Sequence, residues 1–159
     1  MVVAGKRQVD GTPASIDRIE VGAIAARPQL SVSELLRRVP GVAARARQNL
    51  AQDVQLTIRG VGARSTFGVR GLRIFVDGIP ATMPDGQGQV SHIPLEALGH
   101  VDVLRGPFSA LYGNASGGVI EFSSADPPAQ AAFGQRLAGG SNALARESLS
   151  WAGPWRRDG

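Results

Sequence analysis

The sequence contains no cysteine, only one lysine, and few aromatic residues, which make up 5% of its 159 residues. Without cysteine the chain can form no disulfide and can use no thiolate as a nucleophile or metal ligand. No stretch approaches the roughly 20 consecutive apolar residues of a membrane-spanning helix. Glycine and proline are abundant instead, with 21 and 10 copies. Both residues favour turns, so we expect short elements joined by many loops.

The motifs of common enzyme classes are also missing. The phosphate-binding pattern G-x-x-x-x-G-K-[ST] does not occur, and two glycine-rich stretches each lack the third glycine of a dinucleotide-binding loop. Ser109 and Ser116 do not have the flanking glycines of a hydrolase nucleophile. The two histidines, His92 and His100, do not have the spacing of a metal motif. We therefore expect no catalytic residue, no metal and no cofactor.

The chain is basic, with a formal net charge of +4, and every basic residue except Lys6 is an arginine. Because arginine pairs well with phosphates, a nucleic-acid-binding domain is one alternative. The arginines are scattered one or two per predicted element, however, and the few aromatic residues do not alternate with them. Nucleic-acid binding is therefore a remote alternative, which tight and strongly salt-dependent binding would support.

The N-terminal half has patterns typical of one helix and several short strands. Ser31 and Glu34 have the spacing of a capping box, and apolar residues follow at helical spacing as far as Pro40-Gly41. Strict alternation of apolar and polar residues predicts a half-buried strand at 54–58. We also expect strands at 13–21 and 42–47 and a loop at 60–71.

The C-terminal half predicts strands interrupted by a short helix. A strand at 101–104 ends at Gly106-Pro107, and Pro107 suits the first turn of a helix that Gly113 must stop. Gly117-Gly118 should form a corner that needs a positive φ or a close backbone approach. The other expected elements are strands at 72–76, 79–80 and 119–122, an Asp77-Gly78 turn, a loop at 81–92 and a helical turn at 94–98.

A proline-containing boundary at residues 126–128 precedes the last part of the chain. Beyond it, a turn at residues 139–142 separates two extended segments, and in the second of these Leu149 and Trp151 alternate with serines. This pattern predicts one amphipathic β-hairpin.

Five sequence blocks follow one another in an order and spacing that resemble those of a known family. They are LLRRVPGV at 35–42, LTIRG at 56–60, IFVDGIP at 74–80, VLRGP at 103–107, and YG…GGVI at 112–120. Together they span most of residues 13–127 and closely resemble the plug domain of TonB-dependent outer-membrane receptors. The loops at 64–71 and 82–89 further resemble the receptor subgroup that includes the pyrroloquinoline quinone transporter.

The resemblance implies an α+β fold, in which a small mixed β-sheet with short helices fills a transmembrane β-barrel. Residues 1–12 would be a flexible lead, residues 13–127 the plug, and residues 128–159 the first hairpin of an incomplete barrel. In the lead, Val2 and Val3 would be the remainder of the TonB box, which pairs with TonB on the periplasmic side. The implied location is the cell outer membrane.

The implied function is gating of energised uptake of a small, anionic ligand. The partners would be TonB, the receptor barrel and the small-molecule substrate. Arg59 and Arg105 would dock the plug, since the matching arginines in the family pair with carboxylates of the barrel wall; internal pairs with Asp77 or Asp102 are the alternative. The main functional alternative is a free-standing periplasmic or soluble domain that has the plug fold and binds a ligand without transport.

Six loop residues are expected to contact the substrate: Arg64, Phe67, Arg70, Asp85, Gln87 and Gln89. If both loops lie at the same end of the sheet, they combine guanidinium groups, an aromatic ring and amides, which suits a flat anion. Pyrroloquinoline quinone is the expected ligand, and an anionic ferric chelate is the alternative. The competing interpretation is that these arginines are solvated in a glycine-rich loop or meet barrel carboxylates.

Overall fold

The computed structural model describes residues 15–22, 31–46, 53–65, 68–106, 109–113, 115–140 and 145–154. The chain divides into two compact units, Met1–Ser124 and Ala125–Gly159, and each is described by itself. Mixed sheets with a few short helices make up the described residues, which confirms the α+β prediction. None of the described helices is long and apolar enough to cross a membrane.

The first unit contains a five-stranded sheet that contributes one face to the core. Its strands, in spatial order, are β1 (Ser15–Glu20), β8 (Leu98–Arg105), β9 (Gly118–Ser124), β5 (Leu72–Val76) and β6 (Ile79–Pro80). β5 and β9 are parallel, and the other neighbours are antiparallel. On one face, the side chains of Val101, Val103, Ile120 and Phe122 have no exposed surface. The predicted strands in these regions are therefore confirmed.

A second, four-stranded sheet consists of β2 (Val42–Arg45), β3 (Gln55–Ile58), β4 (Val69–Arg70) and β7 (Gln87–Gly88), in that order. β4 lies parallel to β3, and β7 pairs antiparallel with β4. The predictions of uninterrupted loops at 60–71 and 81–92 are wrong at β4 and β7. Strands of two residues are too short to show a period-2 pattern, so only the fold reveals them.

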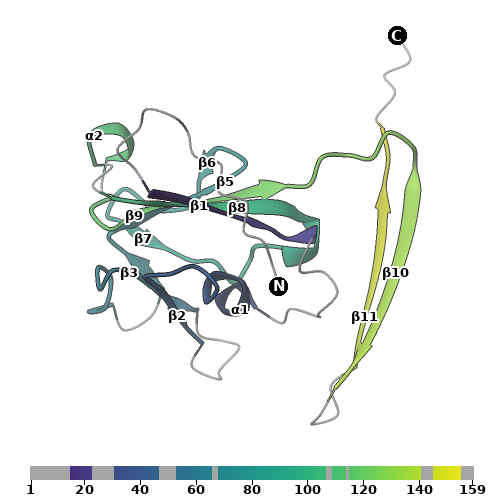
Figure 1. Ribbon diagram of the computed structural model, residues 1–159, viewed down its shortest axis with the longest axis horizontal. Coiled ribbons are helices and arrows are strands. Elements are labelled where there is room, and N and C mark those ends of the chain that lie inside the picture. The colour runs from purple at the N-terminus through teal and green to yellow at the C-terminus, as the bar shows by residue number, and fades with distance from the viewer. Residues whose placement is uncertain are drawn as a thin grey trace. The chain divides into compact units, whose positions relative to one another are not determined.

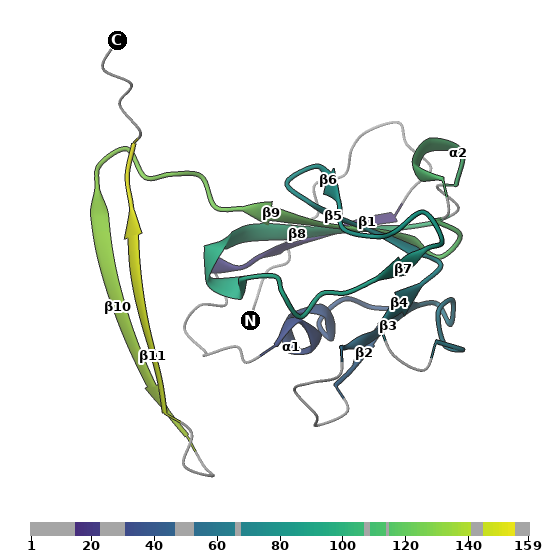
Figure 2. The ribbon, with the colours of Figure 1, turned by 180° about the vertical axis from the view of Figure 1, so that it is seen from behind.

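Short helices lie on both sides of the five-stranded sheet. Figures 1 and 2 show α1 (Val32–Leu36) and the four-stranded sheet on one side of it, and α2 (Ser109–Tyr112) on the other. Leu35 and Leu36 of α1 are fully buried. On the opposite side Tyr112 meets Phe75 edge to face, with ring centroids 5.5 Å apart. The one-turn helix expected near residue 95 is present as η2 (Leu95–Ala97).

The start of α1 differs from the expected capping box. Ser31 is the N-cap residue, but its side chain makes no capping hydrogen bond. Its hydroxyl lies 2.6 Å from the hydroxyl of Ser33, which is itself buried. A hydroxyl two residues away competes with the backbone N–H groups for the same oxygen, which explains why the capping prediction is wrong at this bond.

The β5–β6 hairpin turns at Asp77-Gly78, as predicted, with both residues at positive φ (50° and 75°). The carboxylate of Asp77 accepts hydrogen bonds from the Ser124 backbone N–H (2.7 Å) and hydroxyl (2.6 Å). These bonds, the hydroxyl's first, lower the pKa of Asp77 below its ordinary value of 3.8. Because the folded pKa lies below the unfolded one, the ionised carboxylate stabilises the fold above pH 3.8, and this contribution disappears as pH falls through the folded pKa.

Asp77→Asn should therefore flatten the acid side of the stability profile. Asparagine tolerates positive φ and keeps the turn, but it does not titrate. The free energy of unfolding, measured in urea across the acid range, should fall less steeply with decreasing pH for the variant than for the natural chain. Parallel profiles for the two chains would contradict the assignment.

The second unit is a two-stranded hairpin of β10 (Ala132–Gly139) and β11 (Ala145–Ala152). In its register Phe133 lies opposite Trp151, so both side chains point to one face, together with Leu137 and Leu149. These four side chains are 63–73% exposed within the chain. Gln135 and Glu147 lie on this same face and hydrogen-bond to each other (2.9 Å), and the other face carries arginines and serines. The large apolar side chains of the hairpin are therefore gathered on one face.

Candidate ligand-binding site

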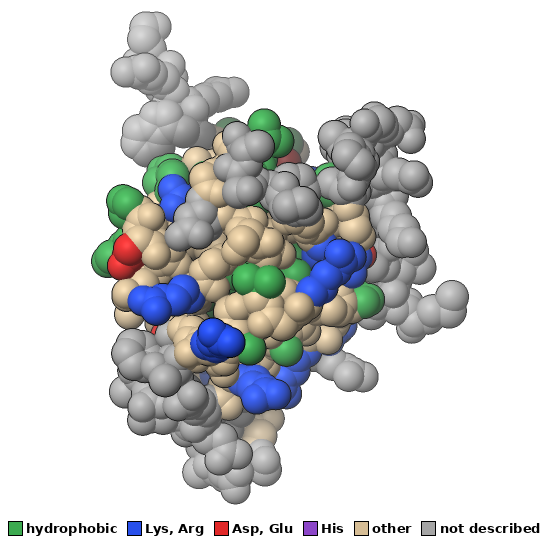
Figure 3. Space-filling model, turned by 90° about the vertical axis from the view of Figure 1, so that its left-hand side faces the viewer, with side chains coloured by type: hydrophobic (Ala, Val, Ile, Leu, Met, Phe, Trp, Pro, Cys, Tyr) green, Lys and Arg blue, Asp and Glu red, His purple; other side chains and the backbone are tan. Residues whose placement is uncertain are grey.

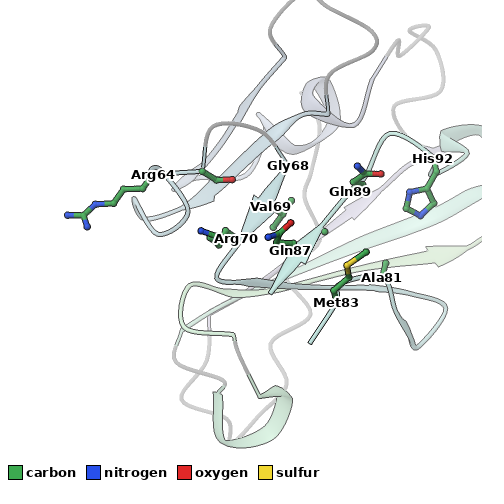
Figure 4. A pocket seen from close by; sticks show the side chains of 11 residues that line it. Arg64, Gly68, Val69, Arg70, Ala81, Met83, Gln87, Gln89 and His92 are labelled. Carbon is green, nitrogen blue, oxygen red and sulfur yellow. The ribbon is translucent and has the colours of Figure 1, made fainter. Parts of the chain in front are cut away.

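The pairing of β4 with β7 joins the two loops that were expected to contact substrate. Val69 lies opposite Gly88, and Arg70 opposite Gln87. This pairing places parts of the two loops side by side. A cavity of about 390 Å³ opens beside this pairing (Figure 4). It is lined by Arg64, Ser65, Gly68, Val69, Arg70, Ala81, Met83, Gln87, Gly88, Gln89 and His92.

Four of the six expected contact residues line this cavity: Arg64, Arg70, Gln87 and Gln89. They do not contribute equally, because the side chain of Arg64 extends away from the other lining side chains in Figure 4. Asp85 is not a lining residue, and its carboxylate accepts the N–H of Gln87 (3.0 Å) within its own turn. Phe67 lies outside the described residues, as do Val2 and Val3.

The structure adds lining residues that sequence reasoning missed, notably Met83 and His92. His92 was considered only as a metal ligand, and the described residues contain no group of three or more His, Asp or Glu side chains that could hold a metal. The sequence signal that could have placed His92 at the site was its position three residues after Gln89, an expected contact residue. The cavity thus combines a guanidinium, two amides and an imidazole, which can donate hydrogen bonds to an anionic ligand.

Two polar side chains next to the cavity are buried, which the alternation pattern did not predict. Gln55 is only 8% exposed, and its amide donates to the carbonyls of Ala63 (3.2 Å) and Ser65 (2.5 Å). Asp53, just before β3, is also 8% exposed, and it accepts backbone N–H groups of Val90 and Ser91. Both side chains therefore connect the start of β3 to the loops that line the cavity.

Arg105, one of the two expected docking residues, has partners within the chain. Its guanidinium forms an ion pair with Asp17 and donates to the Ser15 hydroxyl (2.7 Å) and the Pro40 carbonyl (2.8 Å). The side chain is 13% exposed. The internal alternative expected Asp77 or Asp102 as the ion-pair partner of Arg105, whereas the observed partner is Asp17.

The two carboxylates named by the internal alternative bind other groups. Asp77 accepts from Ser124, as described above. Asp102 accepts from Arg18, with Nε and Nη2 at 2.7 and 2.5 Å. The hydrogen bond to Asp102 is the largest influence on the Arg18 guanidinium, and it raises the pKa of Arg18.

Arg59, the other expected docking residue, is exposed at the tip of a two-residue turn. Arg59 and Gly60 have positive φ (49° and 85°), and the backbones of Ile58 and Val61 pair across them. Within the described part of the chain, the Arg59 side chain has no hydrogen bond or ion pair. Its guanidinium is therefore not held by the described part of the chain.

Basic side chains are distributed over the surface in separate places. Figure 3 shows arginine side chains at several places on one face, with uncharged surface between them, and few acidic side chains. Among the side chains that the structure describes on that face, the arginines do not form the continuous basic stripe that a nucleic-acid backbone would follow.

Comparison with known proteins finds a matching protein family. The family described as TonB-dependent Receptor Plug Domain matches residues 8–119. The vitamin B12 transporter BtuB of Photobacterium profundum is 30% identical over 142 residues, which cover 87% of this chain and 22% of that protein. The ferrienterobactin receptor of Escherichia coli K12 is 34% identical over 104 residues, or 56% of this chain and 13% of that protein.

Solved structures share the fold. The ferric yersiniabactin uptake receptor FyuA of Yersinia pestis superposes with a TM-score of 0.69 at 22% identity, over 91% of this chain and 22% of that one. This chain therefore spans about a fifth or less of the length of these proteins.

Proposed function

The chain belongs to the family of TonB-dependent receptor plug domains, and we propose that it gates an outer-membrane receptor that takes up a small anionic ligand. Its relatives are transporters and receptors of the outer membrane, so the chain is not an enzyme and the outer membrane is its location. The observation that carries the proposal is the family match over residues 8–119, together with the cavity where β4 meets β7.

We propose the same three parts that the sequence suggests. Residues 13–127 act as the plug, residues 1–12 reach TonB through Val2 and Val3, and residues 128–159 form the first barrel hairpin. The apolar and polar faces of β10 and β11 support the last assignment, because barrel strands alternate lipid-facing and lumen-facing residues. The greater length of the relatives favours a plug inside a receptor over a free-standing binding domain. The separated basic groups give no support to nucleic-acid binding.

The ligand of this receptor is proposed to be a flat polycarboxylate, with pyrroloquinoline quinone as the named candidate. Support comes from the loops that resemble that transporter and from the donors of Arg70, Gln87, Gln89 and His92 around the cavity. The named relatives bind vitamin B12 or ferrienterobactin according to their names, so an anionic ferric chelate is the alternative. Stacking of Phe67 on the ligand stays a prediction.

Arg70→Ala in the complete receptor should lower the affinity for pyrroloquinoline quinone by about 10- to 100-fold, measured by calorimetry. A hydrogen bond between charged groups contributes about 1.5–3 kcal/mol, which corresponds to that range. Arg64→Ala should have a smaller effect, because its guanidinium extends away from the cavity.

The matched control for this experiment is Arg38→Ala, since Arg38 is an exposed arginine outside the cavity lining. Its affinity should equal that of the natural receptor. If the double variant of Arg64 and Arg70 also kept full affinity, the cavity would not be the ligand site.

We also propose that Arg59 docks the plug against carboxylates of the barrel wall. Its exposed position and the lack of a partner within the described residues support this role. Arg105 remains a proposed docking residue, but its guanidinium already has three partners within the chain. The two arginines can be distinguished by their effects on the stability of the chain alone, as argued in the Discussion.

A further inference from the structure

We infer that Asp53 is a positioning residue for the candidate ligand-binding site. Its carboxylate holds the backbone segment between Gln89 and His92, two of the polar residues that line the cavity. The importance of this contact for ligand affinity rests on the proposed function, whereas the contact itself does not.

The carboxylate of Asp53 accepts three backbone N–H groups. Oδ1 accepts from Val54 (2.9 Å) and Ser91 (3.2 Å), and Oδ2 accepts from Val90 (3.0 Å). Val90 is fully buried and Asp53 is 8% exposed, so water cannot easily replace the bond between them. A buried N–H that loses its acceptor is costly, so this side chain helps to fix the segment at 90–91, together with the bond from the Ile93 N–H to the Val90 carbonyl (3.2 Å).

Fixing residues 90 and 91 also fixes the directions of their neighbours. The Val90 side chain enters the core and Gln89 is exposed beside it, lining the cavity. In Figure 4, Gln89 and His92 lie near each other on the same side of the cavity. Neither Gln89 nor His92 lies in a helix or strand. The hydrogen bonds to the Asp53 carboxylate therefore hold the backbone between them, as strand pairing would in a sheet.

Gln55 supports the opposite wall in the same way. Its amide donates to the carbonyls of Ala63 and Ser65, on either side of Arg64. Asp53 lies two residues before Gln55, the first residue of β3. The start of β3 thus holds both loops of the site through two neighbouring polar side chains.

The first test is hydrogen exchange of Asp53→Asn in the whole chain, followed by NMR. The amides of Val90 and Ser91 should exchange at least about tenfold faster, because an amide side chain is a weaker acceptor than a carboxylate. The amides of Ile74 and Val103 in the five-stranded sheet should change by less than about twofold, which separates a local effect from general destabilisation.

The matched control is Asp85→Asn, because Asp85 also accepts a backbone N–H but lies outside the cavity lining. It should leave Val90 and Ser91 unchanged. Should Asp53→Asn fail to fold, Asp53→Glu replaces it, because the longer side chain keeps the charge but moves the carboxylate relative to the two amides. Val90 and Ser91 should again exchange faster while Ile74 and Val103 do not. Unaltered exchange of Val90 and Ser91 in the variant that folds would overturn the inference.

The second test is uptake by the complete receptor, with pyrroloquinoline quinone as the probe. Asp53→Asn should raise the half-saturating concentration about tenfold and leave the maximal rate unchanged, since it displaces binding groups and not the gate. If Arg70→Ala has no effect on affinity, the cavity is not the ligand site and the proposed function fails. The hydrogen-exchange result then still shows whether Asp53 holds the backbone at Val90 and Ser91. If Arg70→Ala weakens binding and Asp53→Asn does not, the positioning role is overturned.

Discussion

Gly118→Ala should destabilise the chain by about 4 kcal/mol, the largest loss that we expect from a single methyl group in this fold. Gly118 begins β9 at a φ of 138°, a conformation that side chains rarely adopt. A Cβ atom there would overlap the backbone carbonyl oxygen of Leu104 on the neighbouring strand β8, and it would lie 3.3 Å from Ile58 Cδ1. Strain of about 1–3 kcal/mol adds to a similar overpacking cost, because a backbone atom in a central strand cannot move aside.

The measurement is urea unfolding of the 159-residue chain, with Gly113→Ala as the matched control. Gly113 also has a positive φ (74°), but nothing lies within 4 Å of the position of its Cβ. The control should therefore lose only about 1–2 kcal/mol, the cost of the left-handed conformation. Equal losses for the two variants would show that backbone conformation alone, and not the approach of β8 to β9, requires glycine at residue 118.

This corner was predictable because its signal is local. A glycine pair between two apolar runs indicates a turn or a close approach, and Gly118 provides both. The strands at 72–76 and 119–122 were predictable for the same reason, since apolar residues recur within each segment. Turn chemistry at Asp77-Gly78 is equally local, because both positions need a positive φ.

The cavity could be predicted only in part, because its walls meet through long-range pairing. Arg70 and Gln87 were named from loop composition, but their contact depends on two strands of two residues each. Asp53 and Gln55 were missed because the alternation rule assigns polar residues to solvent. β3 lies between β2 and β4, and here buried polar side chains bond loop backbone that would otherwise lack partners.

The partner of Arg105 was also beyond the reach of sequence patterns. Asp17 is 88 residues away, and it reaches Arg105 because β1 and β8 pair with Ser15 opposite Arg105. Nothing in either segment distinguishes Asp17 from the other carboxylates near a strand. The family resemblance predicted a carboxylate of the barrel as the partner of Arg105, whereas the pairing of β1 with β8 brings Asp17 of the same chain to it.

Arg105→Ala should accordingly destabilise the chain alone by about 3 kcal/mol. The Arg105 and Asp17 side chains are only 13% and 16% exposed, and the guanidinium also donates to Ser15 and Pro40. Removing one member of a buried ion pair costs about 3–5 kcal/mol, and the partial exposure of this pair places it at the lower end. Urea unfolding of the chain without any barrel measures the effect.

Arg59→Ala is the matched control, because Arg59 is an exposed arginine that also precedes a glycine at the end of a strand. Its loss should stay within about 0.5 kcal/mol, the usual range for surface substitutions. Asp17→Asn, alone and combined with Arg105→Ala, completes a double-mutant cycle, in which a coupling free energy of about 1–3 kcal/mol is expected for contacting residues. If the Arg105 variant were as stable as the natural chain, the internal pair would contribute nothing. Arg105 would then join Arg59 as a docking group whose only effect is on plug retention in the complete receptor.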